Sequence, residues 1–195
     1  NAAPQPKLHQ SDTTWRDEEE VTQFHYNKDG SFKEYRIKND KEDGPKPPEP
    51  PSLAEDSTDV LSSTLKVMNK IAAGGKCEGT DKIFDGARSY NLVFHEQNKV
   101  DMKATELNVY AGPATECTVE VKPIAGKWHS KPRGWMSIQE QGREKGTMPT
   151  VWFAQMAPGE PAVPVKIRVK TDYGTLFMHL TGYKGAGKTL QLAQQ

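Results

Sequence analysis

Long hydrophobic runs and an excess of charge of either sign are both missing from this 195-residue sequence. A membrane-spanning helix needs about 18 apolar residues in a row, whereas the longest apolar runs, such as residues 150–154, have the length of a strand. The 26 basic and 26 acidic residues cancel, so the overall field favours neither nucleic acid nor an anionic membrane as a partner. With 34% hydrophobic residues and a mean hydropathy of −0.79, the composition indicates a soluble chain without a transmembrane segment.

Cysteine is scarce as well, because only Cys77 and Cys117 are present. Together with the scattered His95 and His129 they lack the paired short spacings of a zinc site, so no metal site is expected. A lone cysteine pair on strand-like sequence instead predicts a disulfide in an oxidising compartment. It would close a loop of about 40 residues and stabilise the fold by about 4 kcal/mol. The alternative is two buried free thiols in a cytosolic protein.

Catalytic motifs are missing too. The five histidines fall in unrelated segments, and no serine or cysteine nucleophile in a recognisable turn accompanies them. Residues 182–189 match the spelling of a P-loop, but a P-loop needs a following helix to hold the phosphates, and six residues follow Thr189. We therefore predict no bound nucleotide and no other cofactor, and we interpret residues 184–195 as a polar tail.

What the sequence does contain is the alternation of apolar and polar residues that is typical of half-buried β-strands. Residues 20–26 and 31–37 show it on either side of the turn sequence 27–30, so a hairpin is expected there. Further alternating segments are residues 90–95, 117–122, 163–170 and 176–180. The last two are joined through a turn sequence at 171–174, which predicts an antiparallel meander in the C-terminal part.

One helix is predicted, over residues 58–73. Its apolar side chains recur at helical spacing on one face: Leu61, Leu65, Met68 and Ala72. Ser57 or Thr58 can cap its start, Asp59 suits its first turn, and Gly74 can end it. We expect the apolar face to pack on the inner side of a curved sheet, with the two leucines and the methionine filling it.

The chain is long enough for one domain with a sizeable core, and two small domains are the alternative. We predict a polar N-terminal tail or extended lead-in over residues 1–15 and a single β-rich domain over residues 16–195. That domain would contain a stiff proline-rich linker at 44–52, the helix at 58–73, a disulfide-bearing meander at 77–183 and the polar tail at 184–195. The fold class is mainly β: a curved antiparallel sheet or incomplete barrel with one packed α-helix.

Five residues are candidates for ligand binding: Asp85, Arg88, Trp128, Arg133 and Trp135. The last three lie in the irregular-looking stretch 126–149, where aromatic and basic side chains together suit stacking or the binding of an anion. The alternative is a solvated loop whose tryptophans fold back onto the core. The first two flank Gly86, where a carboxylate can sit at a functional bend or simply in a hairpin turn. Because the net charge is zero, no nucleic-acid contact is expected.

Several motifs, in this order, resemble those of a known family. The matching elements are Trp15, residues 24–26 with the Asp29-Gly30 turn, Pro50-Pro51, residues 59–62, residues 77–80, residues 84–90, Cys117 with residues 122–126, residues 151–154, residues 163–165 and Tyr173-Gly174. They resemble an exported family of Gram-negative bacteria known as domain of unknown function 3108, and the resemblance runs from Trp15 to Leu180. The family pattern has more arginine at the positions of Ala87 and Ser89, and a shorter loop than 126–149.

The resemblance implies a secreted, β-rich protein of the cell envelope, with a long curved antiparallel sheet similar in style to periplasmic lipoprotein carriers. It also implies further strands before Pro4 and supplies no catalytic residue. The leading hypothesis is a non-enzymatic periplasmic protein that binds an envelope protein or a hydrophobic, lipid-like molecule. The second is an envelope hydrolase with Asp85 or Asp81 paired with His95 or His129 as acid and base. The third is a structural module whose sheet edges recruit another chain.

Overall fold

The computed structural model describes residues 4–131, 134–171 and 173–192. Within them the chain forms twelve strands, two α-helices and one short 3₁₀ helix, η1 (Pro51–Leu53). Its contacts divide it into two units, of which the first comprises Asn1–Thr64, Asp81–Leu92 and Lys122–Trp128 and the second the remaining residues. The predicted fold class is confirmed in that the protein is mainly β, with antiparallel sheets and no closed barrel among the described strands.

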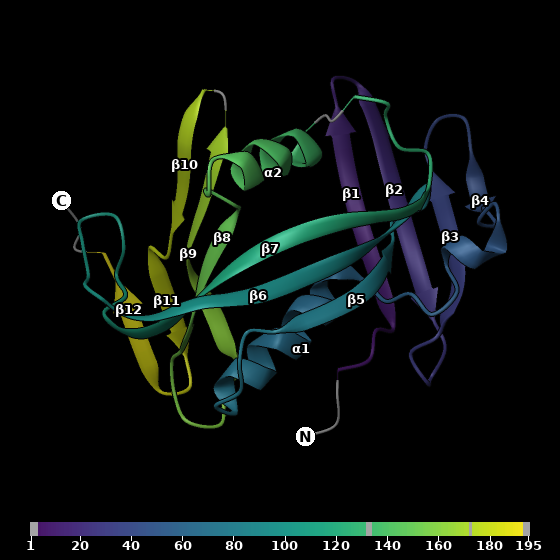
Figure 1. The fold of residues 1–195 in the computed structure, drawn as a ribbon. Coiled ribbons are helices and arrows are strands. Elements are labelled where there is room, and N and C mark those ends of the chain that lie inside the picture. Colours follow the sequence, from purple (N-terminus) through teal and green to yellow (C-terminus); the bar gives the residue numbers. More distant parts are fainter. Residues whose placement is uncertain (1–3, 132–133, 172, 193–195) are drawn as a thin grey trace. The chain divides into compact units, whose positions relative to one another are not determined.

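The first unit contains a four-stranded antiparallel sheet of order β1-β2-β3-β4, drawn in purple and blue in Figure 1. Its strands are β1 (Leu8–Trp15), β2 (Glu18–Tyr26), β3 (Phe32–Lys38) and β4 (Asp43–Pro45). The predicted hairpin is confirmed, because β2 pairs with β3 and Gly30 takes a positive φ of 83° in the turn, a conformation open to glycine. In the core, the ring of Phe24 stacks on Tyr35 and both rings meet the edge of Phe84.

Much of the segment predicted as a polar tail or an extended lead-in, residues 1–15, is a strand. Residues 8–15 form β1, which pairs with β2 along its whole length, from Leu8 opposite His25 to Trp15 opposite Glu18. The strand is exposed on nearly every side chain, so it has no apolar phase from which alternation could predict it. The start of the predicted proline-rich linker also pairs in the sheet. Pro45 lies opposite Arg36 on the outermost strand, where a missing N–H breaks no ladder.

Helix α1 (Val60–Ala72) lies inside the predicted range. Asp59 caps its start, because one carboxylate oxygen accepts hydrogen bonds from the backbone N–H groups of Leu61 (2.9 Å) and Ser62 (3.0 Å). At the other end, Gly74 takes a positive φ of 81°, and the N–H groups of Gly74 and Gly75 close onto carbonyls of the last turn. The sequence therefore places both ends of the helix.

The buried face of α1 differs from the predicted one. Ser63 and Val67 are buried, whereas Leu61 is 66% exposed, and Leu65 and Met68 are only half-buried. A Cβ atom added to Gly79 would lie 3.0 Å from Cγ2 of Val67, so the helix approaches the neighbouring backbone closely. Such an approach selects small residues, and a pattern that ranks positions by hydrophobicity does not register it.

The largest sheet has six strands in the order β10-β9-β8-β7-β6-β5. Its strands are β5 (Gly79–Phe84), β6 (Arg88–Met102), β7 (Gly112–Gly126), β8 (Thr150–Gln155), β9 (Ala162–Thr171) and β10 (Gly174–His179). The predicted C-terminal meander is confirmed, since β8 pairs with β9 and β9 with β10, both antiparallel. So is the predicted disulfide: Cys77 and Cys117 are bonded and fully buried, with Cα atoms 6.2 Å apart.

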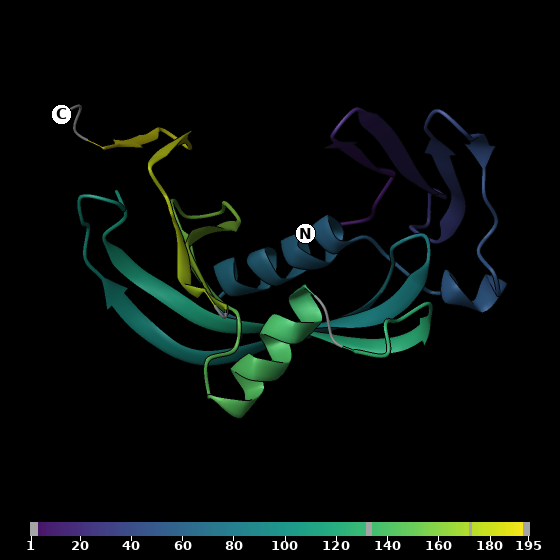
Figure 2. The same ribbon diagram turned by 90° about the horizontal axis from the view of Figure 1, so that it is seen from above.

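The prediction of one helix is wrong, because residues 135–144 form a second helix, α2 (Trp135–Glu144). It buries Gln139 and Gly142 rather than an apolar stripe. The side-chain amide of Gln139 donates to the carbonyl of Val121 at 2.8 Å and accepts from its N–H, and Arg143 forms an ion pair with Glu120. Within the second unit, Figure 2 shows α2 and residues 65–72 of α1 on opposite sides of β6 and β7.

Most of the predicted polar tail, residues 184–191, belongs to a pair of strands instead. Strands β11 (Gly182–Gly185) and β12 (Lys188–Gln191) form a hairpin. Its turn, Ala186-Gly187, takes positive φ at both positions, 48° and 72°, as a two-residue hairpin turn requires. The segment spelled like a P-loop is therefore two paired strands, and Tyr183 and Leu190 pack against the core around Trp152 and Val165. Within the described residues, no helix has the length and apolarity needed to cross a membrane.

Candidate functional site

Asp85 and Arg88 form a closed turn between β5 and β6. One carboxylate oxygen of Asp85 accepts from the backbone N–H of Arg88 at 2.8 Å, and the other accepts from Nε and Nη2 of the same arginine at 2.9 and 2.6 Å. Gly86 takes a φ of 94° between them. The turn interpretation of these residues is confirmed, and both charges are engaged with each other.

Trp128 completes this cluster. The guanidinium of Arg88 lies 4.7 Å from the centre of the indole, and the ring of Tyr90 meets it edge-on at 6.2 Å. The indole N–H donates to the carbonyl of Ala125 at 3.0 Å, and burial raises the pKa of Tyr90. The structure thus brings together three of the five candidates, Asp85, Arg88 and Trp128. The guanidinium of Arg88 already has a carboxylate and an indole as partners. The cluster therefore fits a structural contact between this turn and Trp128 better than an open binding site for an anion.

The other candidates lie elsewhere. Trp135 starts α2 in the second unit and is 38% exposed, and Arg133 falls outside the described residues. Of the proposed hydrolase groups, His129 is exposed, and His95 has its Nδ1 3.5 Å from the carboxylate of Glu78, with both side chains nearly half exposed. Among the described residues, no group of three or more histidine, cysteine or acidic side chains can hold a metal ion.

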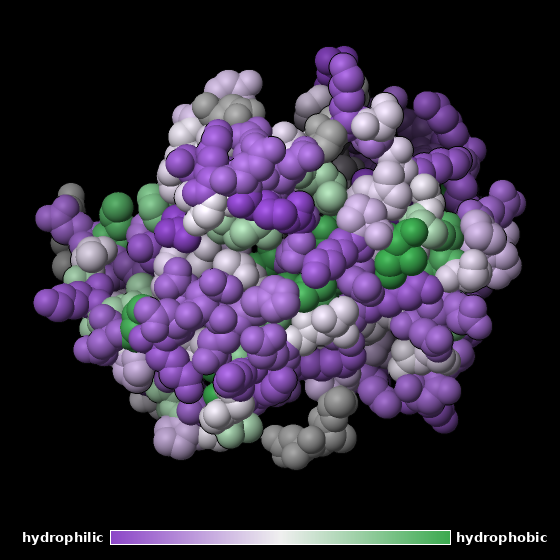
Figure 3. Space-filling model, viewed as in Figure 1, coloured by the Kyte–Doolittle hydropathy of each residue, from purple (hydrophilic) through white to green (hydrophobic). Residues whose placement is uncertain are grey.

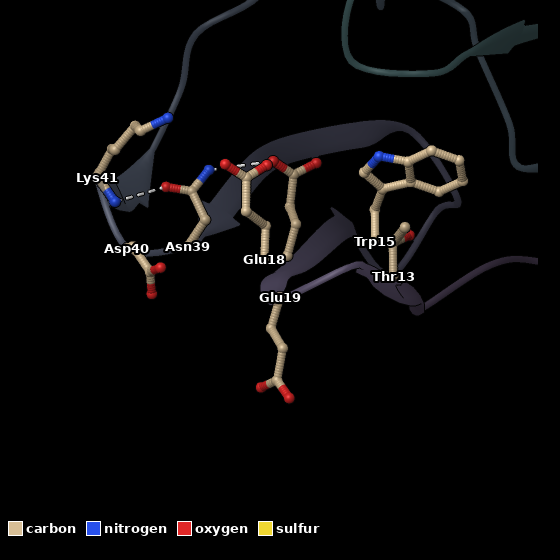
Figure 4. Close-up of a pocket in the computed structure, with 8 residues that line it drawn as sticks. Thr13, Trp15, Glu18, Glu19, Asn39, Asp40 and Lys41 are labelled. Carbon is tan, nitrogen blue, oxygen red and sulfur yellow. Dashed lines mark hydrogen bonds between the residues drawn. The ribbon is translucent and has the colours of Figure 1, made fainter.

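A hollow of about 270 Å³ lies at one end of the four-stranded sheet. Its lining is mostly polar: Thr13, Trp15, Glu18, Glu19, Glu20, Asn39, Asp40 and Lys41. The side-chain amide of Asn39 donates to Glu20 at 3.0 Å and accepts from the N–H of Lys41 at 2.9 Å. Figure 4 shows the side chain of Glu19 directed away from the indole of Trp15, which is 70% exposed. The exposed indole and carboxylates suit weak contacts with cations or sugars.

The most distinctive surface belongs to β10, which forms one edge of the six-stranded sheet. Three successive apolar side chains are exposed there: Leu176 (55%), Phe177 (44%) and Met178 (47%). Residues 176 and 178, which lie on the apolar side of a strand predicted to be half-buried, are thus about half exposed. On the face drawn in Figure 3, by comparison, hydrophilic residues dominate and hydrophobic ones form small separate groups. We call residues 175–179 the β10 edge.

The other edges of the four- and six-stranded sheets are protected in the ways that soluble proteins use. Strand β1 is exposed but polar between Leu8 and Trp15 at its two ends, and β4 is three residues long and ends in proline. Strand β5 buries Ile83 and Phe84 at its end. The β10 edge carries no proline, lysine or carboxylate. Alternation predicts this strand, but its place at the edge depends on the sheet order, which alternation does not contain.

Three cations lie beside the β10 edge on β9: Lys166, Arg168 and Lys170, which we call the basic stripe. The ammonium of Lys166 lies 5.0 Å from the ring centres of both Phe177 and Trp152. The guanidinium of Arg168 lies 5.4 Å from the same indole and donates to the hydroxyl of Thr150 at 3.0 Å. Within the part of the chain that the structure describes, none of the three cations forms an ion pair with a carboxylate.

A family model described as a protein of unknown function, DUF3108, matches residues 1–181. The chain belongs to this family. The match confirms the resemblance between Trp15 and Leu180, and it includes both disulfide cysteines, the basic stripe and the β10 edge of this DUF3108 chain. No curated protein and no solved structure matches the chain significantly. The description of the DUF3108 family assigns no role to any residue.

Proposed function

We propose that this DUF3108 protein is an exported, non-enzymatic binding protein of the bacterial cell envelope that holds a partner protein at the β10 edge. The observation that carries the proposal is the run of three exposed apolar side chains on an unprotected edge strand. Soluble proteins rarely leave such an edge open, because it pairs with other chains.

The energy available at this edge is sufficient for a specific contact. Full burial of a leucine, phenylalanine or methionine side chain contributes about 1.5–3 kcal/mol. Since roughly half of each side chain is still exposed, a partner that covers all three gains about 2–4 kcal/mol. Backbone hydrogen bonds along the strand add to this gain.

The proposed location rests on the disulfide. A bond between Cys77 and Cys117 persists in an oxidising compartment such as the periplasm and is rare in the cytosol. The non-enzymatic assignment rests on Asp85 and Arg88, whose functional groups are engaged with each other in a turn.

The test is the native size of the protein in a periplasmic extract of its Gram-negative host. We expect it to elute in a complex larger than the monomer, with both cysteines oxidised. The double substitution Leu176→Asn and Met178→Asn should release the monomer, whereas Leu107→Asn, at a residue 64% exposed outside the β10 edge, should leave the complex intact. Elution of the wild type as a monomer would contradict the proposal, and a complex that delipidation alone dissolves would replace the protein partner with a hydrophobic molecule.

A further inference from the structure

The backbone of the β10 edge is arranged to accept another strand. The N–H of Leu180 donates to the carbonyl of Val165 on β9 at 3.1 Å. In an antiparallel pair, successive residues point their N–H and C=O groups alternately toward and away from the partner strand. The N–H and C=O groups of residues 176 and 178 therefore bond to β9. Those of residues 175, 177 and 179 point to the other side of β10, where the described residues form no strand.

The two faces of the β10 edge differ in chemistry. Leu176 and Met178 share one face with their cross-strand partners Val169 and Ile167. On the opposite face, Thr175, Phe177 and His179 lie across from Lys170, Arg168 and Lys166 in turn. A strand added beside β10 would continue both faces, since its side chains alternate in the same way.

The cations on the second face have no acidic side chain on their own two strands. Strands β9 and β10 carry three cations and no carboxylate. Along the row of paired residues that contains Lys166, the nearest carboxylate is that of Glu116 on β7, with Trp152 between them. Glu116 forms no ion pair with Lys166 within the described residues, and the ammonium of Lys166 lies 5.0 Å from the ring centre of Phe177 on β10.

We propose that the β10 edge binds an extended segment of a partner protein by strand addition, and that this segment alternates acidic with apolar residues. The inference rests on the proposed function and adds the chemistry of the partner. The apolar side chains of the segment would cover Leu176 and Met178. Its carboxylates would lie on the face of the basic stripe, one strand beyond β10, where the long side chains of the three cations can extend to meet them. Its backbone would pair with residues 175, 177 and 179.

Charge distinguishes this occupant from the two alternatives. A second copy that paired through its own β10 would bring three more cations to the same face and no carboxylate. A lipid chain would cover the apolar face but would leave the outward N–H and C=O groups of the strand without partners, at a cost wherever water is excluded. Only an acidic and apolar strand satisfies the backbone groups, the apolar face and the basic stripe together.

The test uses the purified full chain and a capped peptide of alternating glutamate and valine, long enough to span β10. We expect saturable binding by fluorescence anisotropy, and slower hydrogen exchange at the amides of Thr175, Phe177 and His179. Lys170→Gln should weaken binding roughly two- to fivefold, and the loss should shrink at high salt. Lys103→Gln, which removes a cation outside the stripe, should change nothing.

Two further comparisons distinguish strand addition from nonspecific binding of the peptide. Thr175→Pro removes an outward N–H without removing a bond to β9 and should weaken peptide binding roughly five- to tenfold, while Thr175→Ala should not. A peptide of the same composition with glutamates and valines in separate blocks should bind far more weakly. Equal binding of both peptides, or of one that alternates lysine with valine, would overturn the inference.

Its failure can be told apart from failure of the proposed function. If the alternating peptide does not bind while the periplasmic complex still depends on residues 176 and 178, the partner chemistry is wrong and the surface is right. If the complex itself is absent, both are wrong. Self-association of the purified chain that Leu176→Asn abolishes would make the occupant a second copy and also overturn the acidic-strand inference.

Discussion

Removal of the disulfide should destabilise the protein by an amount that follows from the chain. The bond joins residues 40 positions apart. Closing such a loop lowers the entropy of the unfolded chain, which raises the free energy of the unfolded state by about 4 kcal/mol at room temperature. The double substitution Cys77→Ala and Cys117→Ala should therefore lower the free energy of unfolding by about 4 kcal/mol. Both sulfurs are fully buried, so the small cavities left by alanine add to the loss.

The assay is urea unfolding followed by far-ultraviolet circular dichroism, at equal protein concentration for the wild type and the variant. Reduction of the wild type with a thiol reagent serves as the matched control, since it breaks the bond without changing a side chain, and it should lower stability by a similar amount. A loss below about 1 kcal/mol for both would show that the bond contributes little restraint, contrary to the loop-entropy reasoning.

Three further predictions concern single residues, each read from urea midpoints. Asp59→Ala should cost about 1 kcal/mol by removing the cap of α1, whereas Asp59→Asn, which can still cap, should cost a few tenths; equal losses would contradict the capping role. Gly126→Ala should cost about 2–5 kcal/mol, because its φ is 99° and a Cβ atom would collide with neighbouring backbone, while Gly159→Ala, which has positive φ but open space, should cost about 1 kcal/mol. Burial and the charge of Asp59 raise the pKa of Tyr26 in the folded protein. The unfolded chain therefore loses the phenol proton of Tyr26 at a lower pH than the folded protein does. Stability should then fall above about pH 10 by about 1.4 kcal/mol per pH unit, and Tyr26→Phe should flatten that slope.

The sequence predicts the elements whose apolar residues recur at the regular spacing of a strand or a helix, or whose ends are set by local residue types. Residues 20–37 alternate about a glycine turn and form the expected hairpin, and the segments at 163–170 and 176–180 fall in the expected meander. The ends of α1 follow from an aspartate and two glycines, whose conformational preferences are local. The cysteine pair predicts the bond because no other partner exists for either sulfur.

The missed elements have no such period. Helix α2 buries a glutamine that bonds to the backbone of Val121, and the interior of β1, residues 9–14, is polar on both faces. Both depend on partners distant in sequence, which propensity alone does not supply. The turn at Asp85 was predicted from its residue types, but its contact with Trp128 spans 40 positions of chain, and the exposure of Leu176 follows from sheet order. The candidate site therefore emerges only after the strands are arranged.

The most direct test of the central claim, that the β10 edge is a protein-binding surface, is photo-crosslinking in living cells. A photoreactive amino acid replaces Leu176 in one strain and Leu61, which is 66% exposed on α1, in another. We predict a discrete adduct in the periplasm, larger than the protein by the mass of a partner polypeptide, from position 176 and not from position 61. No adduct at position 176, or the same adducts at both positions, would contradict the account.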